Sequence, residues 1–339
     1  MSTQDELQTT IDALVQKGKG ILAADESSPT IAKRFKAIDV KSTEENRRVY
    51  RSLILATPNL NEFISGVILF EETLTQQDDN GVLLPALCSQ QGIVPGIKVD
   101  AGKIFMVNSP GDEITQGLDG LALRLEKYKE QGARFAKWRN VYHISESTPS
   151  RLAIDANAEM LARYAAICQS QGIVPIVEPE VLIDGDHSLS RCAKVSEDVF
   201  HALFHALHLH HVNLEHIVLK PNMMVPGKEN PNKATPEEVA IETVKVLRRT
   251  VPAAVPSINF LSGGLTPQAA TAYLNAMNQL NPQPWELTFS YGRALQEPAL
   301  KAWKGQSTNH HQTQEALYKR ARLNGAARYG KYSETMESK

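Results

Sequence analysis

Short apolar runs alternate with helical patterns along the chain. Residues 5–17, 156–171 and 190–211 carry apolar side chains at helical spacing. Eight runs rich in β-branched and aliphatic residues predict strands, whose ends fall near residues 25, 69, 99, 138, 178, 220, 262 and 290. Successive strand ends are roughly 40 residues apart, which leaves room for a helix after each strand.

Polar residues mark where several of these helices begin. Ser42 and Glu45 form a capping-box pattern ahead of one predicted helix. Thr235 and Thr266 are each followed by proline, a residue favoured in the first helical turn, and Glu238 completes a capping box with Thr235. These signals place helices between the predicted strands.

Strands that alternate with helices predict an α/β fold with a parallel sheet. The predicted strands span about 265 residues, close to the ~250 residues typical of a (β/α)₈ TIM barrel. An open, doubly wound sheet is the alternative, although no Gly-x-Gly-x-x-Gly motif follows the first strand. No linker divides the chain, so we expect residues 1–339 to form a single (β/α)₈ domain with a short flexible C-terminal tail from about residue 330.

Composition and charge exclude several classes of protein. The 339 residues include 36 Lys and Arg against 38 Asp and Glu, so no basic excess points to nucleic acid. The three cysteines are too few and too widely spaced to indicate a disulfide framework or a cysteine zinc site. No apolar run approaches the ~20 residues of a membrane span. We therefore expect a cytoplasmic protein that binds neither nucleic acid nor membranes.

One predicted strand ends on a lysine. The run Ile217–Leu219 has the pattern of a buried strand, and Pro221 cannot donate to a sheet, so the strand should end at Lys220. Burial lowers the pKa of a lysine, and its neutral amine can then attack a carbonyl. The ordinary alternative is a lysine whose ammonium extends from the strand end into solvent. Taken alone, a single lysine at a strand end favours this ordinary alternative.

Four other predicted strands also end on a charged residue. Side chains two residues apart share a face of a strand, so Asp25, Lys98, Lys137 and Glu178 each follow that face to the strand's end. In a barrel this face is the interior, and active sites form at the C-terminal ends of the strands. Five such strand ends favour a catalytic site. The alternative is a network of buried ion pairs, which rarely stabilises a fold better than apolar packing.

The last two predicted strands lead into loops suited to phosphate. Ser262–Gly264 follows one strand and Ser290–Arg293 follows the other, each ahead of a predicted helix. Glycine lets backbone N–H groups approach a ligand closely, and barrels often bind phosphate at these two loops. A Gly-Gly pair alone is more often a turn, but both loops together predict a phosphate site.

These residues together permit covalent catalysis on a ketone. Lys220 would form an imine, and the nearby charge of Lys137 would lower its pKa. Glu178 would move protons while the carbinolamine loses water. Asp25 would accept a hydroxyl proton and so drive cleavage of a C–C bond. The candidates for binding a second phosphate are Lys98 and Arg139.

Several long motifs resemble those of class I fructose-1,6-bisphosphate aldolases, the Schiff-base-forming, metal-independent class. The resemblance extends from about residue 5 to residue 333. The motifs occupy residues 18–27, 43–48, 96–100, 115–120, 135–139, 173–180, 219–223, 260–264 and 289–295. The resemblance implies a glycolytic and gluconeogenic lyase that reversibly cleaves fructose 1,6-bisphosphate to dihydroxyacetone phosphate and glyceraldehyde 3-phosphate. It also implies a homotetramer with no metal or other cofactor.

The resemblance further implies a role for each site residue. Lys220 would be the imine-forming lysine, and Glu178 the acid and base for imine formation with Glu180 beside it. Asp25 would be the base on the C4 hydroxyl, with Lys137 as its charged neighbour. The implied C1-phosphate ligands are Ser262, Gly263 and Arg293, with Leu261 and Ser290 alongside. Those toward the C6 phosphate are Lys98, Arg139, Ser27 and Thr30, with Arg34 close by.

Three features depart from the family pattern. Animal members carry a tail tyrosine that assists proton exchange, whereas this chain stops soon after Tyr332, so we expect slower carbanion protonation or a different proton donor. Pro29 stands where the family usually has glycine, which predicts a stiffer loop at the C6 phosphate. His216 replaces another glycine and predicts a difference in packing.

Two other functions share parts of this pattern. Another Schiff-base barrel enzyme would act on a different phosphosugar, and comparison with a monophosphate substrate would distinguish it. A catalytically inactive scaffold would have lost one of Lys220, Glu178, Lys137 and Asp25, and none is lost. The histidine-rich helix 190–211 lacks a His-Glu-x-x-His motif, so it predicts a solvated or partly buried helix face and not a metal site.

Overall fold

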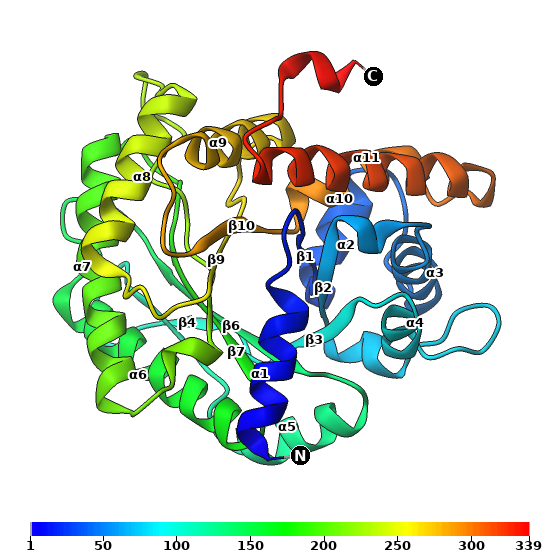
Figure 1. Ribbon diagram of the computed structural model, residues 1–339, viewed down its shortest axis with the longest axis horizontal. Coiled ribbons are helices and arrows are strands. Elements are labelled where there is room, and N and C mark those ends of the chain that lie inside the picture. Colours follow the sequence, from blue (N-terminus) through cyan, green and yellow to red (C-terminus); the bar gives the residue numbers. More distant parts are fainter. Residues whose placement is uncertain (1, 339) are drawn as a thin grey trace.

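The computed structural model describes residues 2–338. Eight parallel strands form a closed barrel in the order β1–β2–β3–β6–β7–β8–β9–β10 (Figure 1). They are β1 Gly20–Ala24, β2 Ile64–Leu69, β3 Val94–Lys98, β6 Phe135–Tyr142, β7 Val174–Val181, β8 Val218–Leu219, β9 Ser257–Phe260 and β10 Glu286–Tyr291. The eight predicted strands and the (β/α)₈ TIM barrel are confirmed, and the open sheet is excluded.

Helices surround the barrel (Figure 1). They are α1 Thr3–Leu14, α2 Ser28–Lys36, α3 Glu44–Leu55, α4 Leu84–Gln90, α5 Leu121–Glu130, α6 Arg151–Ser170, α7 Leu189–Leu209, α8 Pro236–Thr250, α9 Pro267–Gln279, α10 Arg293–Trp303 and α11 His310–Arg328. Thr235 caps α8 in a capping box with Glu238, and Thr266 caps α9, as predicted. The predicted cap of α3 was wrong by one residue, because Thr43 and not Ser42 accepts a free N–H of the first turn.

A small apolar cluster fills the barrel interior. Its members are Leu7, Ile11 and Leu14 of α1 together with Ile21, Ala23, Ile68, Phe135, Val174, Ile176 and Val218 of the strands. Figure 1 shows α1 crossing the ring of strands, where its buried face covers this cluster. A Cβ on Gly96 would lie 2.3 Å from the ring of Phe135, so only glycine fits at this point of β3.

A larger apolar core lies between the barrel and its helices. Phe35 of α2, Tyr50 of α3 and Trp303 of α10 form one aromatic group, with ring centroids 5.1 to 5.7 Å apart. Behind β6, Trp138 contacts Tyr164 of α6 with a centroid separation of 5.5 Å. Full burial of one large apolar side chain stabilises a fold by about 1.5–3 kcal/mol. These contacts hold the helices against the strands that carry the site.

One pair of strands was not predicted. β4 Lys103–Phe105 and β5 Glu113–Thr115 form an antiparallel hairpin between β3 and α5. Each strand has only three residues, too few for an alternating pattern to be recognised, and β4 is exposed along its length. Because the hairpin follows β3, it extends the wall of the barrel at its C-terminal end.

The C-terminal segment packs on α9 and α11. The Tyr332 N–H donates to Asn275 Oδ1 at 2.9 Å, and the Tyr332 hydroxyl donates to Glu337 Oε1 at 2.9 Å. Arg320 of α11 pairs with Glu337 at 2.6 Å. These contacts hold residues 332–337 in place in the structure, and the predicted flexibility of this tail stays a prediction.

Candidate active site

All fifteen predicted site residues line one pocket at the C-terminal end of the barrel. The pocket has a volume of about 730 Å³. From the strands and the loops that follow them it receives Asp25, Ser27, Thr30, Arg34, Lys98, Lys137, Arg139, Glu178, Glu180, Lys220, Leu261, Ser262, Gly263, Ser290 and Arg293. Barrel closure therefore brings together side chains from opposite ends of the sequence.

Along four strands the inward-facing positions change from apolar to charged where the strand reaches the pocket. Their preceding inward residues belong to the apolar cluster inside the barrel. Because side chains two residues apart share a face, the charged residues lie directly above that cluster. The four pairs, apolar residue first, are Ala23 and Asp25, Phe135 and Lys137, Ile176 and Glu178, and Val218 and Lys220.

Lys220 is buried at the end of the short strand β8, with only 3% of its surface exposed. The backbone N–H of Lys220 donates to the carbonyl of Val177 on β7 at 2.9 Å. Pro221 follows and has no N–H, while its carbonyl accepts from the Leu261 N–H at 3.0 Å. The backbone at Lys220 is thus fixed between two neighbouring strands, and its side chain lines the pocket.

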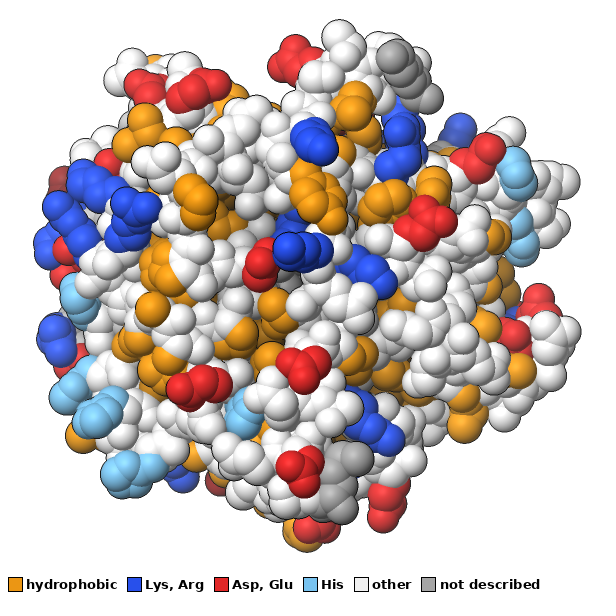
Figure 2. Space-filling model, viewed as in Figure 1, with side chains coloured by type: hydrophobic (Ala, Val, Ile, Leu, Met, Phe, Trp, Pro, Cys, Tyr) orange, Lys and Arg blue, Asp and Glu red, His pale blue; other side chains and the backbone are white. Residues whose placement is uncertain are grey.

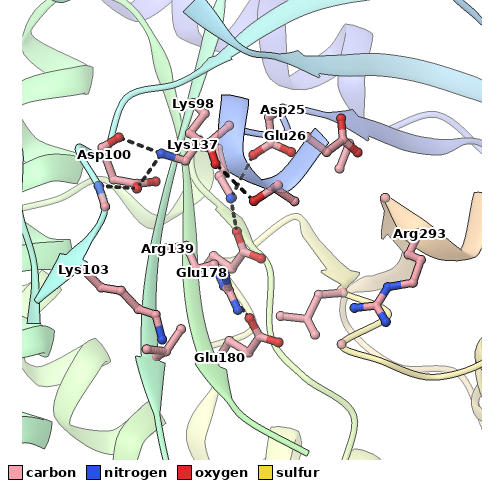
Figure 3. Close-up of a pocket in the computed structure, with 18 of the residues that line it drawn as sticks. Asp25, Glu26, Lys98, Asp100, Lys103, Lys137, Arg139, Glu178, Glu180 and Arg293 are labelled. Atoms are coloured by element: carbon pink, nitrogen blue, oxygen red, sulfur yellow. Dashed lines mark hydrogen bonds and ion pairs between the residues drawn. The ribbon is translucent and has the colours of Figure 1, made fainter. Parts of the chain in front are cut away.

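Glu178 lies between two lysines. Its Oε1 is 3.3 Å from Lys220 Nζ, and its Oε2 is 3.0 Å from Lys137 Nζ. Lys137 also donates to Asp25 Oδ2 at 3.0 Å, and Figure 3 shows its ammonium between the two carboxylates. Lys220, Glu178, Lys137 and Asp25 therefore form a buried chain in which positive and negative groups alternate.

The surroundings give the two lysines opposite tendencies. Burial lowers the pKa of Lys220 and the charge of Lys137 lowers it further, against the opposing effect of Glu178. Burial also acts to lower the pKa of Lys137, but Asp25 and Glu178 outweigh it and raise that pKa. Lys220 is therefore the lysine that deprotonates more readily. The predicted repulsion by Lys137 contributes, but burial is the larger cause.

Asp25 is held as a carboxylate. Burial acts to raise its pKa, but Lys137 and Lys220 outweigh that effect and lower the pKa to about 2. Asp25 is therefore present in the ionised form that can accept a proton from a substrate hydroxyl, although the lowered pKa also makes it a weaker base.

The loops after β9 and β10 form one end of the pocket. Gly263 and Gly264 have φ angles of +30° and +87°, values that favour glycine. The Ser262 carbonyl accepts from the Leu265 N–H at 2.7 Å, which closes a tight turn ahead of α9. Ser290 Oγ is buried and has no hydrogen-bond partner within residues 2–338. This end of the pocket therefore offers a glycine turn and an unsatisfied hydroxyl to a polar ligand.

Arg293 begins α10 at the same end of the pocket. Its side chain is exposed and extends toward the pocket in Figure 3. The other cations that line the pocket each pair with a carboxylate. Arg293 makes no such pair with any described residue, so its guanidinium is available to an anion.

A second set of donors lines the same pocket. Lys98 Nζ is 2.7 Å from Asp100 Oδ1, and Arg139 pairs with Glu180. The remaining members of this set are Ser27, which caps α2, Thr30 in its first turn and Arg34 in its last turn. The Arg34 guanidinium lies near Gly292, since a Cβ built on Gly292 would be 3.8 Å from Arg34 Nη2. Besides the loops after β9 and β10, the pocket thus offers anion-binding groups at Lys98, Arg139 and α2.

Two of the departures from the family pattern have a structural outcome. Pro29 lies in the first turn of α2, so the segment predicted to be a loop is the start of a helix, where proline is well tolerated. His216 is buried and its Nε2 lies 3.0 Å from Gln8 Oε1 on α1. His216 therefore packs against α1, and its difference in packing from family members that have glycine here stays a prediction.

Several residues that shape the pocket were not predicted. Glu26 pairs with Arg34, and Gln296 Nε2 donates to Glu26 Oε1 at 2.8 Å and to the Ala23 carbonyl at 2.7 Å. The Tyr50 hydroxyl completes this buried group by donating to Gln296 Oε1 at 3.1 Å. Glu26 stands next to Asp25, but nothing local in the sequence joins α10 to β1. The other unpredicted charged residues of the pocket are Glu71, Asp100, Lys103, Asp184 and Lys228.

The remaining sequence features contribute no further site. Within residues 2–338, no group of three or more His, Cys, Asp or Glu side chains is placed to hold a metal ion. The histidines of α7 are exposed, and Figure 2 shows histidine side chains on the surface over α6 and α7. Among the described helices, none has both the length and the apolar character needed to cross a membrane.

Comparison with known proteins identifies the family. Residues 6–339 match the model of the glycolytic family described as fructose-bisphosphate aldolase class-I. A probable fructose-bisphosphate aldolase class 1 of Xylella fastidiosa is 51% identical over 329 residues, covering 97% of this chain and 98% of that protein. Human fructose-bisphosphate aldolase C is 54% identical over 329 residues, covering 96% of this chain and 90% of that protein.

A solved structure shares the whole fold. It is the fructose-bisphosphate aldolase of Plasmodium falciparum, solved in complex with TRAP and a small-molecule inhibitor. The two chains are 50% identical and superpose with a TM-score of 0.96, which covers 98% of this chain and 96% of the other. The chain described here belongs to the class-I fructose-bisphosphate aldolase family.

Proposed function

We propose that this protein reversibly cleaves fructose 1,6-bisphosphate to dihydroxyacetone phosphate and glyceraldehyde 3-phosphate through an imine on Lys220. The observation that carries the proposal is the buried chain Lys220–Glu178–Lys137–Asp25 at the end of the barrel. It combines a lysine of lowered pKa with a proton carrier at 3.3 Å and a second, ionised carboxylate.

Imine formation needs a nucleophile and a proton carrier. The neutral amine of Lys220 attacks the C2 carbonyl, and the new carbinolamine loses its hydroxyl as water. Glu178, in contact with Lys220, supplies the proton that this leaving hydroxyl needs and takes up the proton lost by nitrogen. Lys137 keeps its positive charge and holds Glu178 and Asp25 in place.

Cleavage then uses the imine as an acceptor of electrons. Asp25 accepts the proton of the C4 hydroxyl, the C3–C4 bond breaks, and its electron pair moves into the protonated imine to give an enamine. The aldehyde product leaves. Protonation of the enamine at C3, followed by hydrolysis of the imine, releases dihydroxyacetone phosphate and restores the Lys220 amine.

Two phosphate sites account for the bisphosphate substrate. The C1 phosphate lies at the Ser262–Gly264 turn with Arg293 and Ser290, and the C6 phosphate lies toward Lys98, Arg139 and the start of α2. Support for this assignment comes from the glycine turn, from the unpaired guanidinium of Arg293 and from the unsatisfied Ser290 hydroxyl. We further propose a metal-independent, cytoplasmic enzyme that assembles as a homotetramer, as the sequence motifs imply.

A comparison of substrates tests this function. We expect a higher kcat/KM for fructose 1,6-bisphosphate than for fructose 1-phosphate. Lys98→Met should reduce the ratio of these two kcat/KM values, because it should weaken the binding of the bisphosphate and not that of the monophosphate. EDTA should leave the activity unchanged, and Lys220→Met should abolish it. Equal activity on the two sugars would favour the alternative Schiff-base enzyme of different specificity, and loss of activity in EDTA would contradict the mechanism.

A further inference from the structure

Lys228 lies beside the glycine turn that follows β9. A Cβ built on Gly264 would lie 3.0 Å from Lys228 Cε and 3.1 Å from Lys228 Nζ. The ammonium therefore sits against the backbone of the same turn that carries Ser262 and Gly263. Lys228 also lines the pocket, yet it comes from the loop after β8 and shares no contact with the chain Lys220–Glu178–Lys137–Asp25.

Backbone hydrogen bonds hold Lys228 in this position. Its own N–H donates to the Ile183 carbonyl at 2.8 Å, and the preceding Gly227 N–H donates to the His187 carbonyl at 2.8 Å. The loop after β8 thereby packs against the loop after β7. The approach is so close that a Cβ on Gly227 would lie 2.1 Å from the carbonyl oxygen of Gly185. The structure thus presents Lys228 to the β9 turn from a fixed backbone.

The partner of Lys228 is an exposed carboxylate. Lys228 Nζ lies 3.0 Å from Asp184 Oδ1, and the side chains of Lys228 and Asp184 are 46% and 61% exposed. Exposed ion pairs contribute little free energy, so this pair can be exchanged for another anion at small cost. A phosphate dianion is a stronger partner for an ammonium than a single solvated carboxylate.

We propose that Lys228 is a further phosphate-binding residue, which exchanges Asp184 for the phosphate bound at the Ser262–Gly264 turn. This inference rests on the proposed function, because it takes that phosphate to be the one attached to C1 of the substrate. Lys228 touches none of the residues that form or cleave the imine, so its effect falls on binding and not on the chemical step. Asp184 then competes with the substrate for the same ammonium.

Two substitutions with opposite expected effects test the proposal. Lys228→Gln should raise the Kd for dihydroxyacetone phosphate and the KM for fructose 1,6-bisphosphate by about three- to fivefold, with kcat unchanged. Asp184→Asn should lower the same constants by about two- to threefold, because it removes the competing carboxylate. Lys194→Gln, on the exposed face of α7, removes an equal charge and should change neither constant.

The outcomes separate this inference from the proposed function. Binding is measured by calorimetry with dihydroxyacetone phosphate, and borohydride trapping on the wild-type protein shows whether the imine forms. If the imine forms but the Lys228→Gln variant binds dihydroxyacetone phosphate as tightly as the wild type, Lys228 takes no part in phosphate binding and the proposal is overturned. If both substitutions weaken binding, the pair has only a structural role and the proposal is overturned. If the wild-type protein forms no imine, the proposed function itself is wrong and the inference falls with it.

Discussion

Glu178 contacts Lys220 at 3.3 Å through one carboxylate oxygen, while its other oxygen is 3.0 Å from Lys137. One buried carboxylate therefore contacts both the proposed nucleophile and the cation whose charge, together with burial, lowers the pKa of that nucleophile. The two neighbours of Lys220 act on its pKa in opposite directions, since Lys137 lowers it and Glu178 raises it. Changes at the two positions should therefore be distinguishable by pH.

Replacing Lys137 should make Lys220 harder to deprotonate. In Lys137→Met the repulsive charge is gone while Glu178 remains, so the pKa of Lys220 rises and less neutral amine is present at a given pH. The rate of imine formation with dihydroxyacetone phosphate, followed by borohydride trapping across pH, should move to higher pH. Lys137→Arg keeps the charge and should stay close to the wild-type profile. An unchanged profile in Lys137→Met would show that this charge has no effect on Lys220.

Replacing Glu178 should slow proton transfer while moving the pKa of Lys220 the other way. Glu178→Gln removes the carboxylate that favours the ammonium form, so the pKa of Lys220 falls. We expect kcat to drop by about 10²–10⁴-fold, the usual contribution of a general acid and base. Single-turnover measurement of carbinolamine dehydration is the direct test. Dehydration at the wild-type rate would require another residue as the proton carrier.

Loss of the Arg293 guanidinium should weaken binding of the C1 phosphate. Arg293→Ala should raise the KM for fructose 1,6-bisphosphate and the Kd for dihydroxyacetone phosphate by about ten- to a hundredfold, the range for one hydrogen-bonded charge. Arg151→Ala removes another exposed arginine, on α6 and outside the pocket, and provides the control. Unaltered affinity for dihydroxyacetone phosphate in Arg293→Ala would place the C1 phosphate elsewhere.

Gln296 should matter for the stability of the fold. Gln296→Leu leaves the buried Tyr50 hydroxyl and Glu26 without their shared partner, which should lower the free energy of unfolding by about 1–3 kcal/mol. Tyr50→Phe removes a single hydrogen bond and should cost only about 0.5–1.5 kcal/mol. Urea denaturation measures both. Equal losses in the two variants would show that Gln296 does not join α10 to β1 through Glu26.

The barrel and its four central charged residues were predictable because both depend on local patterns. A period of two, read along β1, β6 and β7, is enough to place Asp25, Lys137 and Glu178 on the same face as interior apolar residues. Gln296 and Lys228 were not predictable in this way. Gln296 reaches β1 from α10, and Lys228 reaches the β9 turn because two loops are joined by backbone hydrogen bonds. Such contacts depend on how the closed barrel brings its loops together.

Both causes of the lowered Lys220 pKa, burial at a strand end and repulsion by Lys137, could be inferred from the sequence. That burial is the larger of the two required the packed structure. The hairpin of β4 and β5 was missed for a simpler reason. Strands of only three residues are too short for a periodic signal, and β4 is also exposed along its length.

The central claim is that Lys220 forms an imine with the substrate ketone. The most direct test is to incubate the protein with dihydroxyacetone phosphate, reduce it with borohydride and map the modified peptide by mass spectrometry. The account predicts one adduct, on Lys220, and none in the Lys220→Met variant. An adduct on Lys137 or on any other lysine, or no adduct at all, would contradict it.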